Sequence, residues 1–285
     1  MNDVLIILMG CLVAVSCGLL GCFLVLRKMA MVGDAISHAV LPGIVVTYLI
    51  TGSRESVLML LGAGLIGILT TVLIEFFHKK ARLQEDASIG VTFTWLFALG
   101  VILISYYAGN IDLDQDCVLY GEIAYVPFEP ESIWVMGIVL ILNIAFILLF
   151  YKQLFITTFD PAYAAAIGIS TVLWHYFLMA MVSFTTVAAF ESVGAILVVA
   201  FLVAPPATAY LLTEKLPVML YLTAITGIIA AVGGYFLAGL LDGSISGAMS
   251  TVVGLEFGLA LLFAPKTGIL TKKFAHSSGK EALIQ

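Results

Sequence analysis

Apolar segments long enough to cross a bilayer recur along almost the whole chain, and they restrict its fold more than any other feature. A crossing helix needs about 20 mostly apolar residues. Nine segments meet this requirement, and they leave no stretch long enough for a soluble domain. The nine are 4–26, 32–51, 57–77, 89–108, 132–151, 172–190, 193–213, 217–240 and 246–264. The sequence therefore predicts an all-α polytopic membrane protein in which residues 1–285 form a single transmembrane domain.

The composition agrees with a chain that faces lipid. Charged residues make up only 11% and hydrophobic residues 62%, whereas a soluble domain carries about 25% charged residues because its surface must face water. The net charge of −6 also excludes a nucleic-acid binder, which would be basic. We expect a multi-pass protein of the cell membrane, with the lipid bilayer as a partner and no nucleic acid.

The basic residues predict the orientation, because loops rich in Lys and Arg stay on the cytoplasmic side. With nine crossings and the N-terminus outside, all of the twelve Lys and Arg except Arg54 fall inside. The opposite orientation reverses that ratio. We therefore expect the N-terminus outside and the C-terminus inside, with an acidic outer loop that contains Asp112, Asp114 and Asp116.

Two ionisable residues lie within the second apolar segment. Asp34 and His38 are four residues apart, so they share one face of a helix, and Ser37 sits beside them. A carboxylate and an imidazole on one face can bind a divalent cation. The Pro42-Gly43 pair predicts irregular backbone nearby, which is tolerated at membrane depth where it lines a cavity. The alternative is an Asp–His hydrogen bond that only locks two helices, but the cost of burial favours a functional pair.

Glu191 is a second candidate ligand. It precedes Ser192-Val193-Gly194, next to the seventh apolar segment. It could supply a third carboxylate to the metal or act as an entrance charge. Equally, it could be an ordinary interfacial glutamate at a helix start, where the helix dipole favours an anion.

The connection 152–171 contains signals for a short helix. Asp160-Pro161 is typical of an N-cap followed by proline at the first helical position. Alanines follow, Ala164 among them, and Gly168 is placed to end the helix. A short helix near 158–169 on the inner face could dock into a groove of a partner. It could also lie at the interface with no partner.

The chain has no phosphate-binding loop of the form G-x-x-x-x-G-K-[ST] and no clear nucleophile–base pattern. A pore or permease is therefore expected rather than an enzyme. Two mechanisms stay open from the residues: import driven by ATP on other subunits, or an ATP-independent secondary divalent-cation transporter or channel. A neighbouring reading frame with a phosphate loop, or loss of uptake without ATP, would favour the first.

Three motifs, taken together, resemble those of a known family, and the likeness runs from about residue 5 to 270. They are Gly33-Asp34-Ala35-x-Ser37-His38-Ala39-x-Leu41-Pro42-Gly43, Asp160-Pro161-x-x-Ala164 through Gly168, and Glu191-Ser192-Val193-Gly194-Ala195 through Pro205-Pro206-Ala207-Thr208-Ala209. The chain resembles the integral-membrane permease of ATP-binding-cassette importers for manganese, zinc or iron.

The resemblance implies a system of several parts. Two permeases, either two copies or a copy and a paralogue, form the pathway at their interface. Cytoplasmic ATP-binding-cassette ATPase subunits drive transport, and an extracytoplasmic protein delivers the metal. Asp34 and His38 match the metal pathway, and Glu191 is carried over as a third metal residue. Asp160, Pro161, Ala164 and Gly168 match the helix that contacts the ATPase.

The transported divalent cation is the only metal that the resemblance implies, with no permanently bound cofactor. Oxygen and imidazole ligands without a thiolate favour manganese, with zinc as the next candidate.

Overall fold

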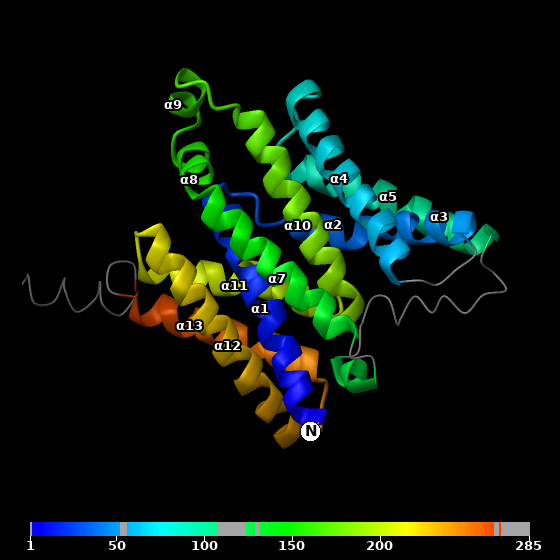
Figure 1. Cartoon of the computed structure of the whole chain (residues 1–285), viewed down its shortest axis with the longest axis vertical. Coiled ribbons are helices and arrows are strands. Elements are labelled where there is room, and N and C mark those ends of the chain that lie inside the picture. Colours follow the sequence, from blue (N-terminus) through cyan, green and yellow to red (C-terminus); the bar gives the residue numbers. More distant parts are fainter. Residues whose placement is uncertain (1, 52–55, 108–122, 129–130, 265–267, 269–285) are drawn as a thin grey trace, which may run out of the picture.

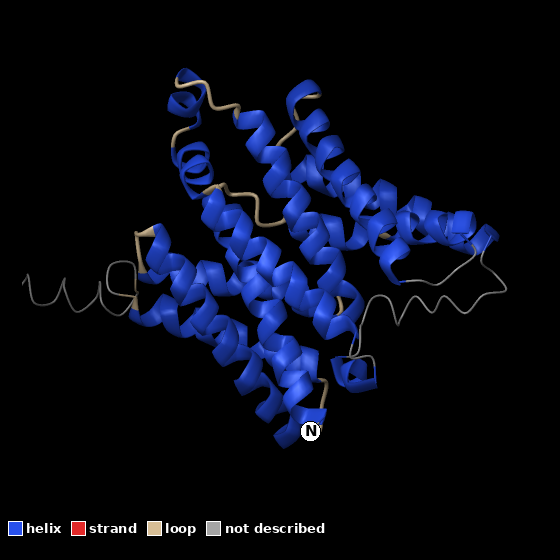
Figure 2. Ribbon diagram, in the orientation of Figure 1, coloured by secondary structure: helices blue, strands red, loops and turns tan. Residues whose placement is uncertain are grey.

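The computed structural model describes residues 2–51, 56–107, 123–128, 131–264 and 268. Every regular element in these residues is helical (Figure 2). The elements are α1 (Asn2–Leu26), α2 (Val32–Ala39), α3 (Leu41–Thr51), α4 (Ser56–Lys80), α5 (Glu85–Tyr107), η1 (Ile123–Phe128), α7 (Glu131–Leu149), α8 (Tyr151–Phe159), α9 (Pro161–Ala166), α10 (Thr171–Val193), α11 (Ala195–Leu212), α12 (Leu216–Leu241) and α13 (Ile245–Phe263).

Nine of the described spans are long and apolar enough to cross a membrane, and α2 and α3 together make one of them. The predicted all-α fold with nine crossings is therefore confirmed. Large apolar side chains stay exposed along the spans, such as Leu240 at 83% and Trp134 at 77%. In water this would be costly, but in a bilayer these side chains contact lipid tails. The orientation of the termini stays a prediction, and the acidic loop with Asp112, Asp114 and Asp116 lies outside the described residues.

The helices form two groups that are joined by α10 (Figure 1). In the first group, α1 packs against α7, α11 and α12, and α13 packs against α11 and α12. The second group contains α2, α3, α4 and α5. The joining helix α10 contacts α1 and α7 on one side and α2 and α4 on the other. Because α2 also contacts α11, the predicted metal residues lie where the two groups meet.

Small residues set the closest approaches between helices. A Cβ added to Gly21 of α1 would overlap the backbone carbonyl of Leu202 in α11, and one added to Gly234 of α12 would overlap the backbone of Met249 in α13. Without a Cβ, the two backbones in each pair can meet directly. Association of helices in lipid depends on such close packing, since lipid tails are as apolar as the side chains.

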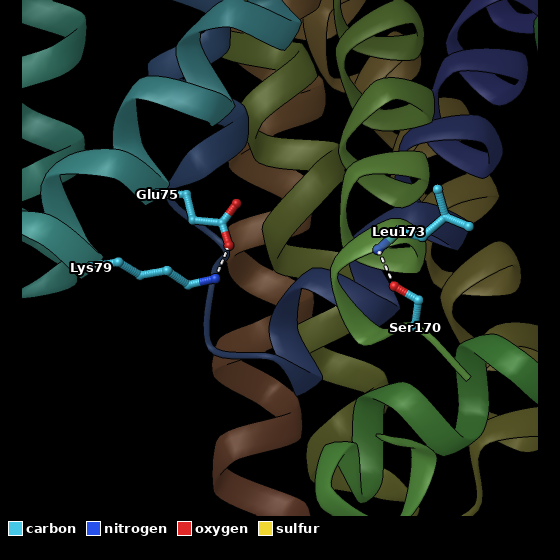
Figure 3. A network of polar contacts seen from close by, with 4 residues as sticks. All are labelled: Glu75, Lys79, Ser170 and Leu173. Carbon is cyan, nitrogen blue, oxygen red and sulfur yellow. Dashed lines mark hydrogen bonds and ion pairs between the residues drawn. The ribbon is translucent and has the colours of Figure 1, made fainter. Parts of the chain in front are cut away.

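Several polar side chains bond to one another across helices or to nearby backbone. Asn143 of α7 donates to the hydroxyl of Thr185 in α10 at 2.8 Å, and that hydroxyl donates back to Asn143 at 3.2 Å. Ser170 caps α10 by accepting from the backbone N–H of Leu173 at 3.3 Å (Figure 3). The buried Asn143–Thr185 pair satisfies polar groups that would otherwise be costly in a low-dielectric interior, whereas the exposed Ser170 satisfies a free N–H at the start of its helix.

Replacing Gly21 by alanine is expected to lower the free energy of unfolding by about 1–3 kcal/mol, the usual cost of overpacking. The added methyl would meet backbone rather than a movable side chain. Gly137→Ala is the matched control, because nothing lies within 4 Å of a Cβ there and alanine favours a helix over glycine by about 1 kcal/mol. Thermal unfolding in detergent measures both. Equal midpoints for Gly21→Ala and the wild type would contradict the close approach.

Candidate metal site

The second crossing is interrupted directly after the predicted site residues. α2 ends at Ala39, and α3 begins at Leu41. Pro42 has no backbone N–H, so the carbonyl of His38, four residues earlier, loses its helical donor. The ring of Pro42 packs closely on α5, since a Cβ added to Gly100 would lie 2.9 Å from Cδ of Pro42. The backbone irregularity predicted from Pro42 and Gly43 is only a local interruption, since Val40 keeps helical dihedral angles and the N–H of Ile44 bonds to the carbonyl of Val40 at 3.2 Å.

Asp34 and His38 lie together on a partly exposed face of α2. Nε2 of His38 is 3.5 Å from Oδ1 of Asp34, and each side chain is 32% exposed. Ser37 points the other way: it is 2% exposed, and its hydroxyl donates to the carbonyl of Gly33 at 2.9 Å. The structure therefore brings the side chains of Asp34 and His38 together and turns the Ser37 hydroxyl away from them.

The imidazole of His38 packs on two aromatic rings of α5. The ring centroids lie 5.9 Å from Phe93 and 6.1 Å from Phe97. These contacts restrict the orientation of the imidazole, which a ligand side chain needs. The sequence analysis did not identify the two phenylalanines, because aromatic residues four apart on an apolar helix are equally expected for ordinary packing.

The described residues of one chain do not form a complete metal site. Among the residues that the structure describes, no three His, Cys, Asp or Glu side chains gather closely enough to hold a metal ion. Divalent cations take four or more ligands in proteins. The pair of Asp34 and His38 can therefore bind a cation only together with ligands from outside this set, such as water or another protein chain.

Glu191 lies in the last turn of α10, which continues to Val193. The alternative interpretation placed it at a helix start, and this placement is wrong. Gly194 ends the helix with a φ of +83°, a left-handed conformation that favours glycine. The side chain of Glu191 lies outside the described residues, so its role as a metal ligand stays a prediction.

The short helix predicted from Asp160-Pro161 is confirmed as α9. The Asp160 carboxylate accepts from the backbone N–H of Tyr163 at 2.9 Å, and proline occupies the first turn. Ala164 is buried. Gly168, with a φ of +83°, follows the helix, and the N–H of Ile169 bonds to the carbonyl of Ala164 at 2.9 Å. This is the Schellman pattern of a helix end.

A second short helix, α8, precedes α9 and was not predicted. The sequence predicted one short helix near 158–169 in the connection 152–171, whereas residues Tyr151–Phe159 form an additional helix before it. Leu154 is fully buried on one side of α8, whereas Lys152 is exposed. Figure 1 places α8 and α9 at the end of the molecule opposite the N-terminus, as five crossings between the N-terminus and α8 require.

Comparison with known proteins gives one consistent result. The ABC 3 transport family matches residues 4–264. The chain is 51% identical over 278 residues to the manganese transport system membrane protein MntD of Bacillus subtilis, covering 94% of each chain. It is 43% identical to the zinc transport system membrane protein TroD of Treponema pallidum, covering 94% of this chain and 75% of the other.

A solved structure of a similar protein supports the same family assignment. The chain superimposes on a chain of PsaBC from Streptococcus pneumoniae, solved in complex with Fab, with a TM-score of 0.81 and 33% identity over 94% of both chains. Nine apolar spans and this common fold define a multi-pass permease of the cell membrane. The chain belongs to the ABC 3 transport family, which confirms the resemblance carried by the three motifs.

Cysteine substitution tests which face of α2 reaches water. Asp34→Cys and His38→Cys in the assembled permease are expected to react with a small, membrane-impermeant thiol reagent, because both positions are partly exposed and an exposed thiol ionises and reacts readily. Ser37→Cys is the matched control on the same helix, and it should stay unmodified. The wild-type chain gives the background from its own cysteines. Equal labelling at positions 34 and 37 would contradict the described geometry.

Proposed function

We propose that the chain is the permease subunit of an importer that moves a divalent transition-metal cation across the cell membrane, driven by ATP hydrolysis on partner subunits. Membership of the ABC 3 transport family favours this mechanism over an ATP-independent transporter or channel. Manganese is the proposed cargo, because the relative with 51% identity is a manganese transport protein. Zinc is the second candidate, supported by the 43% identical zinc transport protein.

The observation that carries this proposal is the partly exposed pair of Asp34 and His38 within a crossing. The pair supplies one oxygen ligand and one nitrogen ligand. In a pathway between two permeases, the same pair from a second copy would complete a site of four protein ligands. A paralogue with matching residues could replace the second copy. Glu191 is proposed as a further ligand near this pathway.

Such a site fits transport better than storage. A conduction site must bind a cation firmly enough for entry and weakly enough for release. Carboxylate and imidazole ligands suit manganese, but affinity alone rises along the series from manganese towards copper. Selection of manganese is therefore proposed to depend on site geometry and on the extracytoplasmic protein that delivers the metal.

The coupling to ATP is proposed to run through α9, which would lie on the cytoplasmic face. Asp160, Pro161 and Gly168 fix the two ends of the helix, and the buried Ala164 seats it on the protein. Tyr163 stays 56% exposed and Ile167 47% exposed, so both can insert into a groove on an ATPase subunit. The residues that shape α9 and those that would bind the partner are thus different.

Substitution of the proposed ligands tests the site. Asp34→Asn and His38→Gln are each expected to abolish uptake of radioactive manganese by cells, because each removes one ligand type from a site with few ligands. Ser37→Ala is the matched control and should retain uptake, since its hydroxyl bonds only to its own helix. Co-purification with the ATPase shows whether each variant assembles. Normal uptake by both ligand variants would refute the site.

A substitution on α9 tests the docking surface. Tyr163→Ala is expected to reduce the amount of ATPase that co-purifies with the permease by about tenfold, which corresponds to a loss of about 1.4 kcal/mol of binding free energy. Ile141→Ala on α7 is the control, because Ile141 is also highly exposed but lies in the middle of a crossing. Unchanged ATPase recovery with Tyr163→Ala would argue against docking through this side chain.

A further inference from the structure

A single arginine connects the end of α1 to α8. Arg27 directly follows α1, and its Nε donates to the hydroxyl of Thr158 at 3.1 Å. Its second terminal nitrogen donates to the hydroxyl of Thr157 at 3.0 Å. Both threonines lie in the last turn of α8, and α9 follows after Asp160. Within the described ranges, no other side-chain hydrogen bond joins α8 to another element.

Two hydroxyl acceptors fix the position of the Arg27 guanidinium. Thr157 is 7% exposed, and its hydroxyl donates to the carbonyl of Gln153 at 2.8 Å, so it is left to accept from Arg27. Burial lowers the pKa of Arg27 to about 10, and the guanidinium therefore stays charged at neutral pH. The part of the chain that the structure describes places no carboxylate in ion-pair contact with it. The Arg27 side chain is partly buried, and its charge is held by two threonine hydroxyls of α8 rather than by a carboxylate.

Along the chain, Arg27 is followed by a short turn and then by α2, which carries Asp34 and His38. Lys28 adopts a φ of +63°, and the N–H of Met29 bonds to the carbonyl of Leu24 at 2.9 Å, which closes α1 with a Schellman pattern. The carbonyl of Met29 then accepts from the N–H of Val32 at 3.2 Å, at the start of α2. Asp34 lies in the first turn of α2. The connection from Arg27 to Asp34 is therefore a hydrogen-bonded turn rather than a loose loop.

The end of α8 has free space beside it. Leu26, Phe159 and the segment 210–216 line a cavity of about 450 Å³ between α1, α8 and the connection from α11 to α12. Phe159, the last residue of α8, is therefore not closely packed against that connection. A displacement of α8 and α9 can be accommodated there, while Arg27 ties their movement to the turn before α2.

We propose that Arg27 is a positioning residue that transmits displacement of α9 to α2, and thereby changes the placement of Asp34 and His38 during each transport cycle. The inference rests on the proposed function, in which α9 contacts the ATPase and α2 carries the metal ligands. Movement of one packed element by another is a common form of coupling between distant sites. Arg27 itself touches neither the metal nor the ATPase in this scheme.

The test uses the permease assembled with its ATPase subunits and delivery protein in liposomes. Radioactive manganese uptake and phosphate release are measured together, which gives the number of ions transported per ATP hydrolysed. Arg27→Gln removes the charge and the double contact, and Thr158→Val removes one acceptor with little change in shape. We expect about a tenfold fall in this ratio for Arg27→Gln, the usual range of coupling between sites, and a smaller fall for Thr158→Val.

Two further variants make the result specific. Thr226→Val is the control, because the hydroxyl of Thr226 bonds only within its own helix, to Leu222 at 3.0 Å and to Thr223 at 3.2 Å. It should leave the ratio unchanged. The combined Arg27→Gln and Thr158→Val variant should show no larger loss than Arg27→Gln alone, since both changes break the same link.

The outcomes separate the link from the transport function. A normal ratio of ions to ATP in both Arg27→Gln and Thr158→Val overturns the proposal. A loss of uptake that only parallels a loss of assembled complex also overturns the proposal, because Arg27 would then stabilise the fold without transmitting movement. If the wild-type complex itself takes up no manganese on ATP hydrolysis, the proposed function fails, and this inference fails with it.

Discussion

Hydrogen bonding of the backbone inside the bilayer is the constraint on which the other features of this protein depend. No water is present at that depth, so each N–H and C=O group needs a partner within the protein. Long helices meet the requirement, and they account for the nine spans. The break between α2 and α3 departs from the rule, because Pro42 cannot donate to the carbonyl of His38. This local interruption lies where α4, α5, α10 and α11 contact α2.

The candidate site has two features: it places ionisable side chains within a crossing, and it offers fewer ligands than a divalent cation needs. Asp34 and His38 are ionisable groups within a crossing, and each is partly exposed in the single chain. Two ligands do not hold a divalent cation, so the arrangement has chemical sense only if further ligands meet this face. A pair of candidate ligands on an exposed face is compatible with the proposed pathway between two permeases. It also suits transport, since separation of the two faces would release the ion.

The sequence predicted a large part of the fold because hydropathy is a strong signal for crossing helices. It also predicted α9, since Asp160, Pro161 and Gly168 are local signals that act over a few residues. It missed α8, which has no side-chain N-cap. One of the two interpretations of Glu191, an interfacial glutamate at a helix start, was wrong, because α10 continues to Val193. The contacts of His38 with Phe93 and Phe97 were also missed, because packing partners far apart in sequence leave no local pattern.

The sequence by itself determined that the protein faces lipid rather than water, how many times it crosses the membrane, and that Asp34 and His38 share one helix face. These follow from residue type and helical period, which are properties of short segments. Only the tertiary structure decided that Ser37 faces the interior, that Gly21 meets the backbone of Leu202, and that Arg27 reaches α8. Such contacts join residues separated by one or more crossings, and they depend on how the helices pack rather than on any segment alone.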